Sequence, residues 1–454
     1  MDRIAIHALR SLSLLLLAAG LGACGRWIDS APSFAPRDPY AESTPRLDKG
    51  DRVLYSFEGS PDGMTPSQEV VFGPAGTLVS TTDVGGLHEP QCGQGGCGVV
   101  YQLTPEGSGY TEEVLHYFKG PSYGDGDAPF GNLIAGPHGE FYGTTYSGGK
   151  MTQLDGTVFE LKRTKHGYAE KILYEFPGYP YDGVTPYGGL VRSSSGTLYG
   201  TTGFGGKYGF GTVFALAPAK GGFVETLLHS FDGHDGSEPV SQPSIDAHGS
   251  LYGTTNSGGE SCGGYGCGVI FKMTKTGTSY DFNVISLLSK KIQGFFPSYG
   301  VLLGNNGTVY ATTQAGGRHG CGTIFQLKPQ RGRYVSTILH AFDCDGGPES
   351  PHSVPASGPG GVIYGTTANG GNPGCPPYTC GTVFSLVPSS KGYHLSTVYE
   401  FKASMDGSHP NAGVIVDSSG TLYGTTFDGG AFGLGTVYEI TTPRPEASII
   451  ASPK

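Results

Sequence analysis

One short phrase recurs seven times along this chain and constrains its fold more than any other feature. The phrase is an apolar or aromatic step, then small residues and a pair of threonines, and it reads TLYGTT at residues 197–202 and again at 421–426. The threonine pairs begin at residues 81, 144, 201, 254, 312, 366 and 425, so successive copies lie 53 to 63 residues apart. A period of that length without a helical pattern inside it predicts radially repeated sheet rather than a helical solenoid.

The composition agrees with an all-β protein. The 454 residues include 79 glycines, 32 prolines and 27 tyrosines, and charged residues make up only 15% of the chain. These residue types are typical of short strands joined by tight turns. The formal net charge is −10 and no basic stripe is present, so we expect no nucleic-acid partner.

The N-terminus has the features of an export signal. An apolar run at residues 12–21 is too short for an ordinary transmembrane helix and is followed by Leu-Gly-Ala-Cys ending at Cys24. This ending resembles the lipobox of bacterial lipoproteins, in which the cysteine is lipidated; the alternative is an ordinary signal peptide that contains a cysteine. Because Gly25 rather than aspartate follows Cys24, the resemblance favours the outer membrane of a Gram-negative bacterium. We therefore expect an exported chain that is anchored to the lipid bilayer through Cys24.

The other eight cysteines respect the repeat. Three pairs are five residues apart, and one cysteine lies in the same slot of a fourth unit; an exported chain favours oxidation, so we expect four disulfides. The expected pairs are Cys92–Cys97, Cys262–Cys267, Cys375–Cys380 and Cys321–Cys344. Metal binding by these cysteines is the rival interpretation, but no histidine pair lies beside them at ligand spacing.

One unit, residues 185–231, can be parsed completely. Strands are predicted at 186–191, 198–202, 211–216 and 225–231, separated by glycine-containing turns and by a longer glycine-rich loop between the second and third strands. Four antiparallel strands joined in this way make one propeller blade. Apolar residues on both faces of the third strand indicate a sheet packed between two neighbouring sheets. The repeated threonines are expected to be core positions rather than nucleophiles.

The ends of the array predict how the ring closes. The first strand, at residues 53–57, matches the fourth strand of a unit, and strands near 413–417, 422–426 and 436–440 match the first three. Pairing them yields an all-β, seven-bladed β-propeller of four-stranded antiparallel blades with no exposed edge. The predicted organisation is a signal peptide at 1–24, a flexible tether at 25–50, the propeller at 51–442 and a disordered tail at 443–454.

The repeated unit can be written PxxGLV…G-x-LYGTT…GG…GTVF-x-L…LY-x-F…DG. It closely resembles the GloVer repeat of the choice-of-anchor tandem-repeat proteins of bacteria, and the resemblance covers about residues 50–442. That family implies a surface-attached repeat protein, with Cys24 as the anchor here, and no settled activity. The strand order is also similar to that of kelch propellers, as a fold-level analogy. One unit departs from the pattern at residues 283–294, where we expect a looser ring.

Candidate binding residues are those that differ between units. The glycine-rich loops and the Asp-Gly turns between blades should share one face, where propellers usually bind ligands around the central channel. Positions just after the inter-blade proline change from unit to unit. Those we expect at the channel mouth are Asn132, Tyr187, Gln242, Tyr299, His352 and Asn411. Neutral variation on a solvated rim is the alternative.

The Asp-Gly turns also admit two interpretations. Turn chemistry explains Asp62, Asp125, Asp182, Asp235, Asp345 and Asp406. Calcium binding is the sharper alternative, suggested by Asp125 with Asp127, but an Asp-x-Asp-x-Asp-Gly run is missing.

Two functions remain open. The first is a surface-anchored binding or interaction module for a glycan or protein ligand, and the second is a propeller lyase or hydrolase acting on polysaccharide or cell-wall material. An enzyme would need an asymmetric cluster of titratable residues at the axis, and His352 is the only histidine that we place there. We therefore expect a monomeric binding module without catalytic residues, metal site or cofactor.

Overall fold

A computed structural model describes residues 51–442, except 90, 91, 93, 94, 151–154, 179–181, 260, 261, 263, 264, 298, 377, 391 and 404. The expected signal peptide with Cys24, the tether and the tail lie outside these residues. Within the described part of the chain, no helix is long and apolar enough to cross a membrane.

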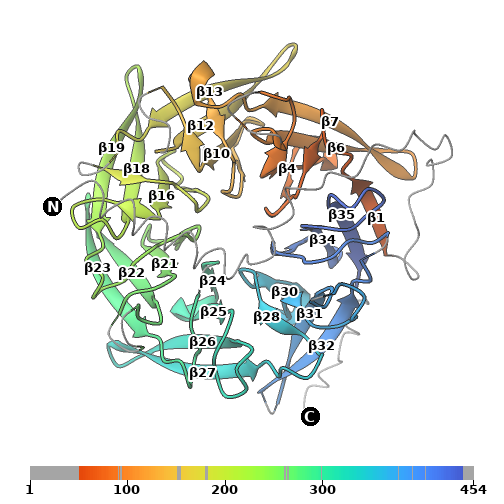
Figure 1. Cartoon of the computed structure of the whole chain (residues 1–454). Coiled ribbons are helices and arrows are strands. Elements are labelled where there is room, and N and C mark those ends of the chain that lie inside the picture. Colours follow the sequence, from red (N-terminus) through yellow and green to blue (C-terminus); the bar gives the residue numbers. More distant parts are fainter. Residues whose placement is uncertain are drawn as a thin grey trace, which may run out of the picture. The chain divides into compact units, whose positions relative to one another are not determined.

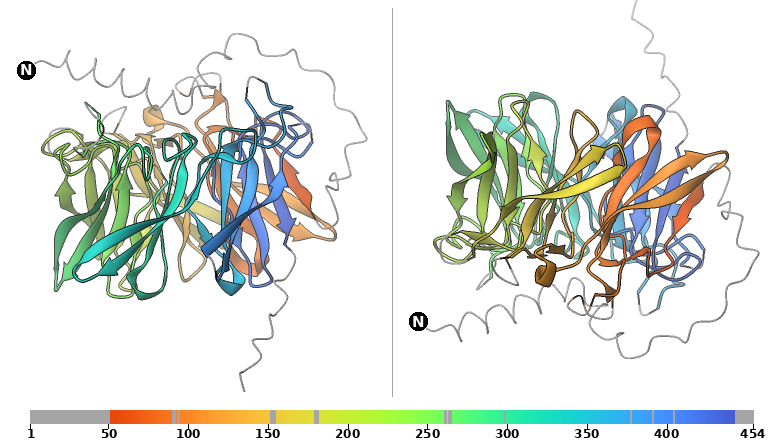
Figure 2. Two further views of the ribbon diagram at one scale, coloured as in Figure 1. Left: turned by 90° about the horizontal axis from the view of Figure 1, so that it is seen from below. Right: turned by 90° about the horizontal axis from the view of Figure 1, so that it is seen from above.

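The chain forms seven four-stranded antiparallel blades around a central axis (Figure 1). In each blade the first strand lies nearest the axis and the fourth at the outer edge, and Figure 2 shows the strands running between the two faces of the ring. Blades 1 to 3 comprise β3 (Val71–Phe72), β4 (Leu78–Thr82), β6 (Val99–Glu106) and β7 (Gly109–Tyr117); β9 (Ile134–Ala135), β10 (Phe141–Thr145), β12 (Thr157–Thr164) and β13 (Gly167–Glu175); and β15 (Val191–Arg192), β16 (Leu198–Thr202), β18 (Thr212–Ala219) and β19 (Gly222–Ser230).

Blades 4 to 6 repeat this order, and β28 (Glu349–Pro351) adds a fifth strand to blade 6. They comprise β20 (Ser244–Ile245), β21 (Leu251–Thr255), β22 (Val269–Thr276) and β23 (Ser279–Leu287); β24 (Val301–Leu303), β25 (Val309–Thr313), β26 (Thr323–Gln330) and β27 (Arg333–Ala341); and β29 (Ala356–Ser357), β30 (Ile363–Asn369), β31 (Thr382–Ser389) and β32 (Gly392–Glu400). Short 3-10 turns are η2 (Pro74–Gly76), η4 (Pro121–Tyr123), η5 (Asn305–Gly307) and η6 (Pro359–Gly361).

Blade 7 joins the two ends of the array, as predicted. Its strands are β33 (Ile415–Val416), β34 (Thr421–Thr426), β35 (Thr436–Thr441) and β1 (Arg52–Ser56). β1 runs antiparallel to β35 with Arg52 opposite Glu439, and the two side chains form an ion pair at 3.0 Å. The closing strand therefore pairs the edge of β35 and becomes the outermost strand of this blade, as the fourth strand is in the other blades.

The innermost strands are shorter than predicted. Residues 186–191 were expected to form a strand, but only the last of them enters the two-residue β15. The reason is that the preceding backbone serves the neighbouring blade: the carbonyl of Gly188 accepts a hydrogen bond from the Thr144 hydroxyl at 3.1 Å. The backbone before β15 thus lies against the previous blade, and the ladder of its own blade begins only at Val191.

The threonine pairs are the hydrogen-bonding scaffold of the ring. In six of the seven pairs the first threonine donates its hydroxyl to a backbone carbonyl of the following blade. These bonds join Thr81 to Pro129, Thr144 to Gly188, Thr201 to Ser241, Thr312 to Ser353, Thr366 to Ala412 and Thr425 to Gln68. The seventh, Thr254, bonds to the Ser241 hydroxyl of its own blade instead. The expected core role of the threonines is confirmed.

A glycine before each third strand lets the next blade approach. Gly211 has φ +97°, and a Cβ atom there would lie 2.5 Å from Cδ of Pro239, the proline that opens the next blade. The same contact, at 2.5 to 2.9 Å, recurs at every blade boundary. The pairs are Gly98–Pro129, Gly156–Pro186, Gly211–Pro239, Gly268–Pro297, Gly322–Pro351, Gly381–Pro410 and Gly435–Pro66. Any side chain at these glycines would be strained and would push two blades apart.

The unit with the divergent sequence is as regular as the others, so the expected looser ring is wrong. Leu288 takes the place of the phenylalanine that ends the fourth strand elsewhere; it is fully buried, and its N–H donates to Gly268 at 3.3 Å. Phe231 and Phe342 make the same bond to Gly211 and Gly322, each at 3.0 Å. Leucine is apolar and large enough to fill the same site between blades.

All four expected disulfides are formed. Cys92–Cys97, Cys262–Cys267 and Cys375–Cys380 close short loops with Cα separations of 4.9, 5.2 and 5.1 Å. Cys321–Cys344 joins two loops with a Cα separation of 5.6 Å. These distances lie within the usual range for disulfides.

We predict that Gly211→Ala destabilises the ring more than Gly221→Ala does. Both glycines have a positive φ, +97° and +100°, so the conformational strain of alanine is shared by the two variants. Only at Gly211 would the methyl group meet Pro239, whereas nothing lies within 4 Å of the corresponding position at Gly221. Denaturant unfolding should show an additional loss of about 1–3 kcal/mol for Gly211→Ala. Equal losses would show that the glycine–proline contact does not hold the blades.

Candidate functional site

The Asp-Gly turns and the glycine-rich loops lie on one face of the ring, as predicted. They pair as two-stranded ribbons: β2 (Gly63–Met64) with β5 (Val84–Gly85), β8 (Gly126–Asp127) with β11 (Ser147–Gly148), and β14 (Gly183–Val184) with β17 (Phe204–Gly205). Single bridges and β28 repeat this pairing in the other four units. We call this side of the ring the loop face.

The aspartates of these turns hold the backbone. Asp62 accepts the N–H of Glu58 at 3.0 Å, and Asp406 accepts the N–H of Lys402 at 3.1 Å. In the divergent unit Gln293 replaces the aspartate and accepts the N–H of Ser289 at 3.2 Å. An amide does this job as well as a carboxylate, so these contacts support turn chemistry rather than calcium binding.

A belt of side chains narrows the channel three residues after each inter-blade proline. The seven positions are Glu69, Asn132, Gly189, Gln242, Gly300, Val354 and Gly413. Asn132 accepts a hydrogen bond from the Glu69 N–H at 3.0 Å and donates to Gln242 at 3.1 Å. Since Asn132 and Gln242 belong to blades 2 and 4, their bond passes in front of blade 3 and must lie in the channel. Two of the six predicted site residues are therefore brought into contact.

Glycines in this belt let neighbouring blades approach closely, because each leaves space for a side chain or for backbone of the next blade. A Cβ atom at Gly413 would lie 2.2 Å from a carboxylate oxygen of Glu69, and one at Gly189 would lie 2.7 Å from the Asn132 carbonyl. Burial raises the pKa of Glu69 to about 7, and only the Gly413 N–H opposes this shift. The belt thus holds one carboxyl group that takes up a proton near neutral pH.

Above the belt, towards the loop face, Tyr187 belongs to an aromatic cluster. Its ring stacks on that of Phe130 with centroids 5.0 Å apart, and Tyr146 packs edge-on against both. All three side chains remain partly exposed. They offer aromatic surface to a ligand at the channel mouth.

Tyr299 and His352 meet at the opposite side of the mouth. The Tyr299 hydroxyl lies 2.8 Å from His352 Nδ1, and Gln314 donates to the same hydroxyl at 3.2 Å. Burial, with a contribution from His409, lowers the pKa of His352 to about 4, and burial raises the pKa of Tyr299. His352 is therefore neutral at physiological pH. The sixth predicted residue, Asn411, is partly exposed, and among the described residues it makes no contact with either cluster.

The residue after each threonine pair was missed by sequence reasoning. These residues are Asp83, Tyr146, Gly203, Asn256, Gln314, Ala368 and Phe427. They differ between units in the same way as the residues after the prolines, so the same criterion could have found them. The two sets meet in the structure: Ser67 donates to Asp83 at 2.6 Å, and the rings of Phe130 and Tyr146 pack edge-on with centroids 5.6 Å apart.

Asp83 is the second carboxyl group of the channel with a shifted pKa. Its side chain is buried, and burial raises its pKa to about 7 even though Ser67 and Gln68 bond to it. Together with Glu69, it gives the channel a protonation state that changes near neutral pH.

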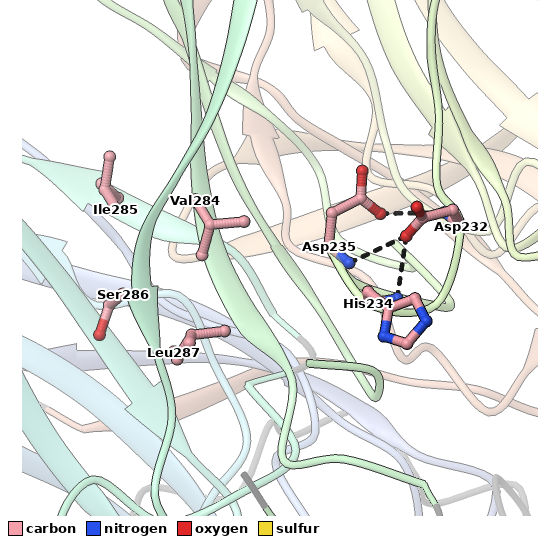
Figure 3. A pocket seen from close by; sticks show the side chains of 7 residues that line it. All are labelled: Asp232, His234, Asp235, Val284, Ile285, Ser286 and Leu287. Carbon is pink, nitrogen blue, oxygen red and sulfur yellow. Dashed lines mark hydrogen bonds between the residues drawn. The ribbon is translucent and has the colours of Figure 1, made fainter. Parts of the chain in front are cut away.

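A different hollow lies at the outer edge between blades 3 and 4 (Figure 3). It has a volume of about 520 Å³ and is lined by Asp232, His234, Asp235 and residues 284–287 of β23. The Asp232 carboxylate accepts the backbone N–H groups of His234 and Asp235 at 2.9 and 3.1 Å. Its acidic groups are thus committed to the turn, so we place the candidate site at the channel mouth.

A family model described as the Gloeobacter/Verrucomicrobia repeat matches residues 44–265 and 243–452, which together span the whole ring. The chain belongs to this repeat family. The expected GloVer resemblance is therefore confirmed, and the threonine, glycine and proline contacts described above are the physical content of the repeat. Among curated proteins, the chain has no significant match.

Similar solved structures include two with distant sequences. A proposed 6-phosphogluconolactonase from Bacteroides uniformis is 11% identical, with a TM-score of 0.48, covering 77% of this chain and 88% of its own. A puromycin-hydrolysing peptidase from Mycobacterium tuberculosis is 10% identical, with a TM-score of 0.48, covering 83% of this chain and 51% of its own.

We predict that Asp83→Asn stabilises the repeat ring increasingly as the pH rises from 5 to 8. The folded chain holds a proton on Asp83 up to about pH 7, whereas an aspartate of the unfolded chain releases it near 3.8. The stability contributed by this proton is complete below pH 4 and is lost as the pH rises through 7. Asparagine does not titrate, so the thermal midpoint of the variant should rise relative to that of the native chain as the pH increases from 5 to 8.

Asp281→Asn is the control, because Asp281 is exposed on β23. Its difference from the native chain should not change between pH 5 and pH 8. A constant difference for Asp83→Asn as well would contradict the shifted pKa.

Proposed function

We propose that this protein is a lipid-anchored binding module of the cell envelope and that its ligand docks at the channel mouth on the loop face. The observation that carries the proposal is that the constant and the variable positions of the repeat have different roles. The positions that stay constant are committed to joining blades, whereas the positions after the prolines and after the threonine pairs vary and meet around the axis. Variation gathered at one end of a rigid ring is typical of a recognition surface.

The chemistry of the mouth suits a glycan or a peptide. The partly exposed Phe130, Tyr146 and Tyr187 offer planes for stacking, and the partly exposed Gln314 offers an amide group beside Tyr299 at the opposite side of the mouth. Such contacts contribute on the order of 1 kcal/mol each. Single-site affinity should therefore be weak, and useful attachment would depend on many anchored copies.

The proposed location rests on the N-terminus and the disulfides. Four disulfides are typical of an oxidising compartment outside the cytoplasm. The lipobox ending at Cys24 supports attachment to the bilayer, and Gly25 supports the outer membrane.

An enzyme acting on polysaccharide or cell-wall material is the second candidate. The observation in its favour is that Glu69 and Asp83, both at the channel, have pKa values raised to about 7, as general acids do. If the site is catalytic, Asp83→Asn should abolish turnover while keeping binding. If it is a binding site, no turnover should be found with any ligand that binds.

We predict that Tyr187→Ala weakens binding about tenfold for a ligand found in a screen of glycans and peptidoglycan fragments. The variant removes one aromatic face of the cluster with Phe130, and one such contact is worth about 1–1.5 kcal/mol. Tyr123→Ala is the control, because Tyr123 is 60% exposed and lies beside Lys150 and Glu170 rather than at the axis. Isothermal titration should show unchanged affinity for the control. The reverse result would move the site to the outer rim.

We also predict that Cys24→Ser releases the protein from the membrane fraction. Without the thiol no acyl chain can be attached, so the chain loses the lipid on which the proposed anchor depends. Fractionation of cells expressing each form should place the native chain with membranes and the variant in the soluble envelope fraction. Equal partition of the two forms would argue against the lipid anchor.

A further inference from the structure

The outer parts of neighbouring blades meet at a recurring polar site. In five of the seven units, a tyrosine or histidine two residues before the phenylalanine that follows the fourth strand faces the aspartate of the next Asp-Gly turn. Tyr55, Tyr174 and Tyr399 donate to Asp62, Asp182 and Asp406 at 2.9, 2.6 and 2.8 Å. In this arrangement the phenol hydroxyl satisfies the carboxylate and ties the strand to the turn.

Three of these boundaries receive a glutamate from the next blade. Glu112, Glu170 and Glu225 occupy equivalent positions, opposite Leu103, Leu161 and Leu216 in their sheets. Burial and the nearby Asp62, Asp125 and Asp182, respectively, raise the pKa of each glutamate to about 7. Each boundary thus gathers two carboxyl groups and one ring side chain.

Only the boundary between blades 1 and 2 combines both carboxyl groups with a histidine, among the boundaries whose residues are described. His116 of β7 stands where Tyr55 and Tyr174 stand elsewhere, beside Asp125 and Glu170. One ligand atom from each of the three residues lies within 4.8 Å of the other two. His116 Nε2 and Glu170 Oε1 are shielded from water, and neither forms a hydrogen bond with any described residue.

The boundary between blades 3 and 4 shows what a histidine does without the glutamate. There His229 Nε2 lies 2.8 Å from Asp235 and makes a normal hydrogen bond, while Phe282 replaces the glutamate and stacks on the imidazole at 3.7 Å. At the first boundary the corresponding distance from His116 to Asp125 is 3.4 Å, too long for a good hydrogen bond. Where the glutamate is present, the histidine nitrogen thus lies too far from the aspartate for a good hydrogen bond and is available to bind an ion.

We propose that His116, Asp125 and Glu170 form a binding site for one divalent transition-metal ion of the zinc type, which links blade 1 to blade 2. One imidazole nitrogen and two carboxylates are a ligand set that zinc accepts, with water in the fourth position. Zinc bonds to such ligands are about 2.0–2.2 Å long, so two ligand atoms of a tetrahedral ion lie roughly 3.3–3.6 Å apart. The 3.4 Å between His116 Nε2 and Asp125 Oδ2 matches that spacing.

The surroundings orient the ligands and allow access. Asp125 is held by the N–H groups of Lys119 at 2.9 Å and Gly126 at 2.7 Å, an outer shell of the kind that positions metal-bound carboxylates. Glu170 also lines an open depression with Tyr123, Lys150 and Tyr174, which gives a dissolved ion a route to the site.

The test is a zinc titration of the purified chain, treated first with EDTA and then dialysed, by calorimetry and by thermal unfolding. We expect one saturable site per chain and a rise of several degrees in the thermal midpoint, because the ion binds the folded ring and not the unfolded chain. His116→Tyr reproduces the Tyr55 and Tyr174 boundaries, so it should fold normally. It should weaken zinc binding about 100-fold or more, as should Glu170→Gln, since even outer-shell changes cost 10–100-fold.

The matched control is His229→Tyr, the same exchange at a boundary without the glutamate. It should bind zinc as the native chain does. Cobalt bound to the native chain should give visible absorption bands of a four- or five-coordinate ion, and these bands should disappear in His116→Tyr. A native chain that binds no zinc at 100 micromolar free ion, or equal affinity in native chain, His116→Tyr and Glu170→Gln, would overturn the proposal.

Discussion

The contact between a glycine of one blade and the proline that opens the next sets the spacing of the whole ring. The glycine has a positive φ and no side chain, so the proline ring lies where a Cβ atom would be, at 2.5 to 2.9 Å in every unit. This close approach brings the threonine pair within reach of the backbone just beyond the proline. Thr201 then donates to Ser241 at 2.8 Å, and five equivalent threonines do the same at their own boundaries. Because the contact recurs all the way round, the last blade meets the first, and β1 completes its sheet.

Because the constant residues of the repeat join the blades, the residues at the axis can differ between units. Constant residues are occupied in packing and backbone hydrogen bonds, so substitutions there would separate blades. The variable positions project into the channel, where alternation of glycine with larger residues decides what fits. The Glu69 side chain fills the space that Gly413 leaves open, and Gly189 and Gly300 let the backbone of Asn132 and Gln242 approach closely. Recognition by such a ring can change through a few side chains without any change in the scaffold.

The outer boundaries between blades show a second use of the repeat. A tyrosine that donates to an aspartate is a simple structural tie, as Tyr174 with Asp182 illustrates. Exchange of that tyrosine for a histidine removes the hydroxyl and introduces a nitrogen that can bind a cation. Whether it does so depends on the neighbouring blade, because Glu170 and Phe282 occupy the same position at two different boundaries. The repeat therefore places a ring side chain beside an aspartate, and single substitutions of that side chain or of its neighbour in the next blade determine what the boundary can bind.

The all-β class, the seven blades, the closure by the first strand and all four disulfides can be predicted from the sequence. These follow from a period that is written out seven times, from strand signals at the two ends and from cysteines placed in equivalent slots. Tertiary structure alone decided how short the innermost strands are, since their carbonyls serve the neighbouring blade. It also decided which side chains meet at the axis. Asn132 and Gln242 are 110 residues apart, and His116 and Glu170 come from different blades. Neither pair can therefore be predicted from a local spacing in the sequence. Residues of separate units come together only when the ring has closed, so their separation in the sequence does not predict how close they lie in the structure.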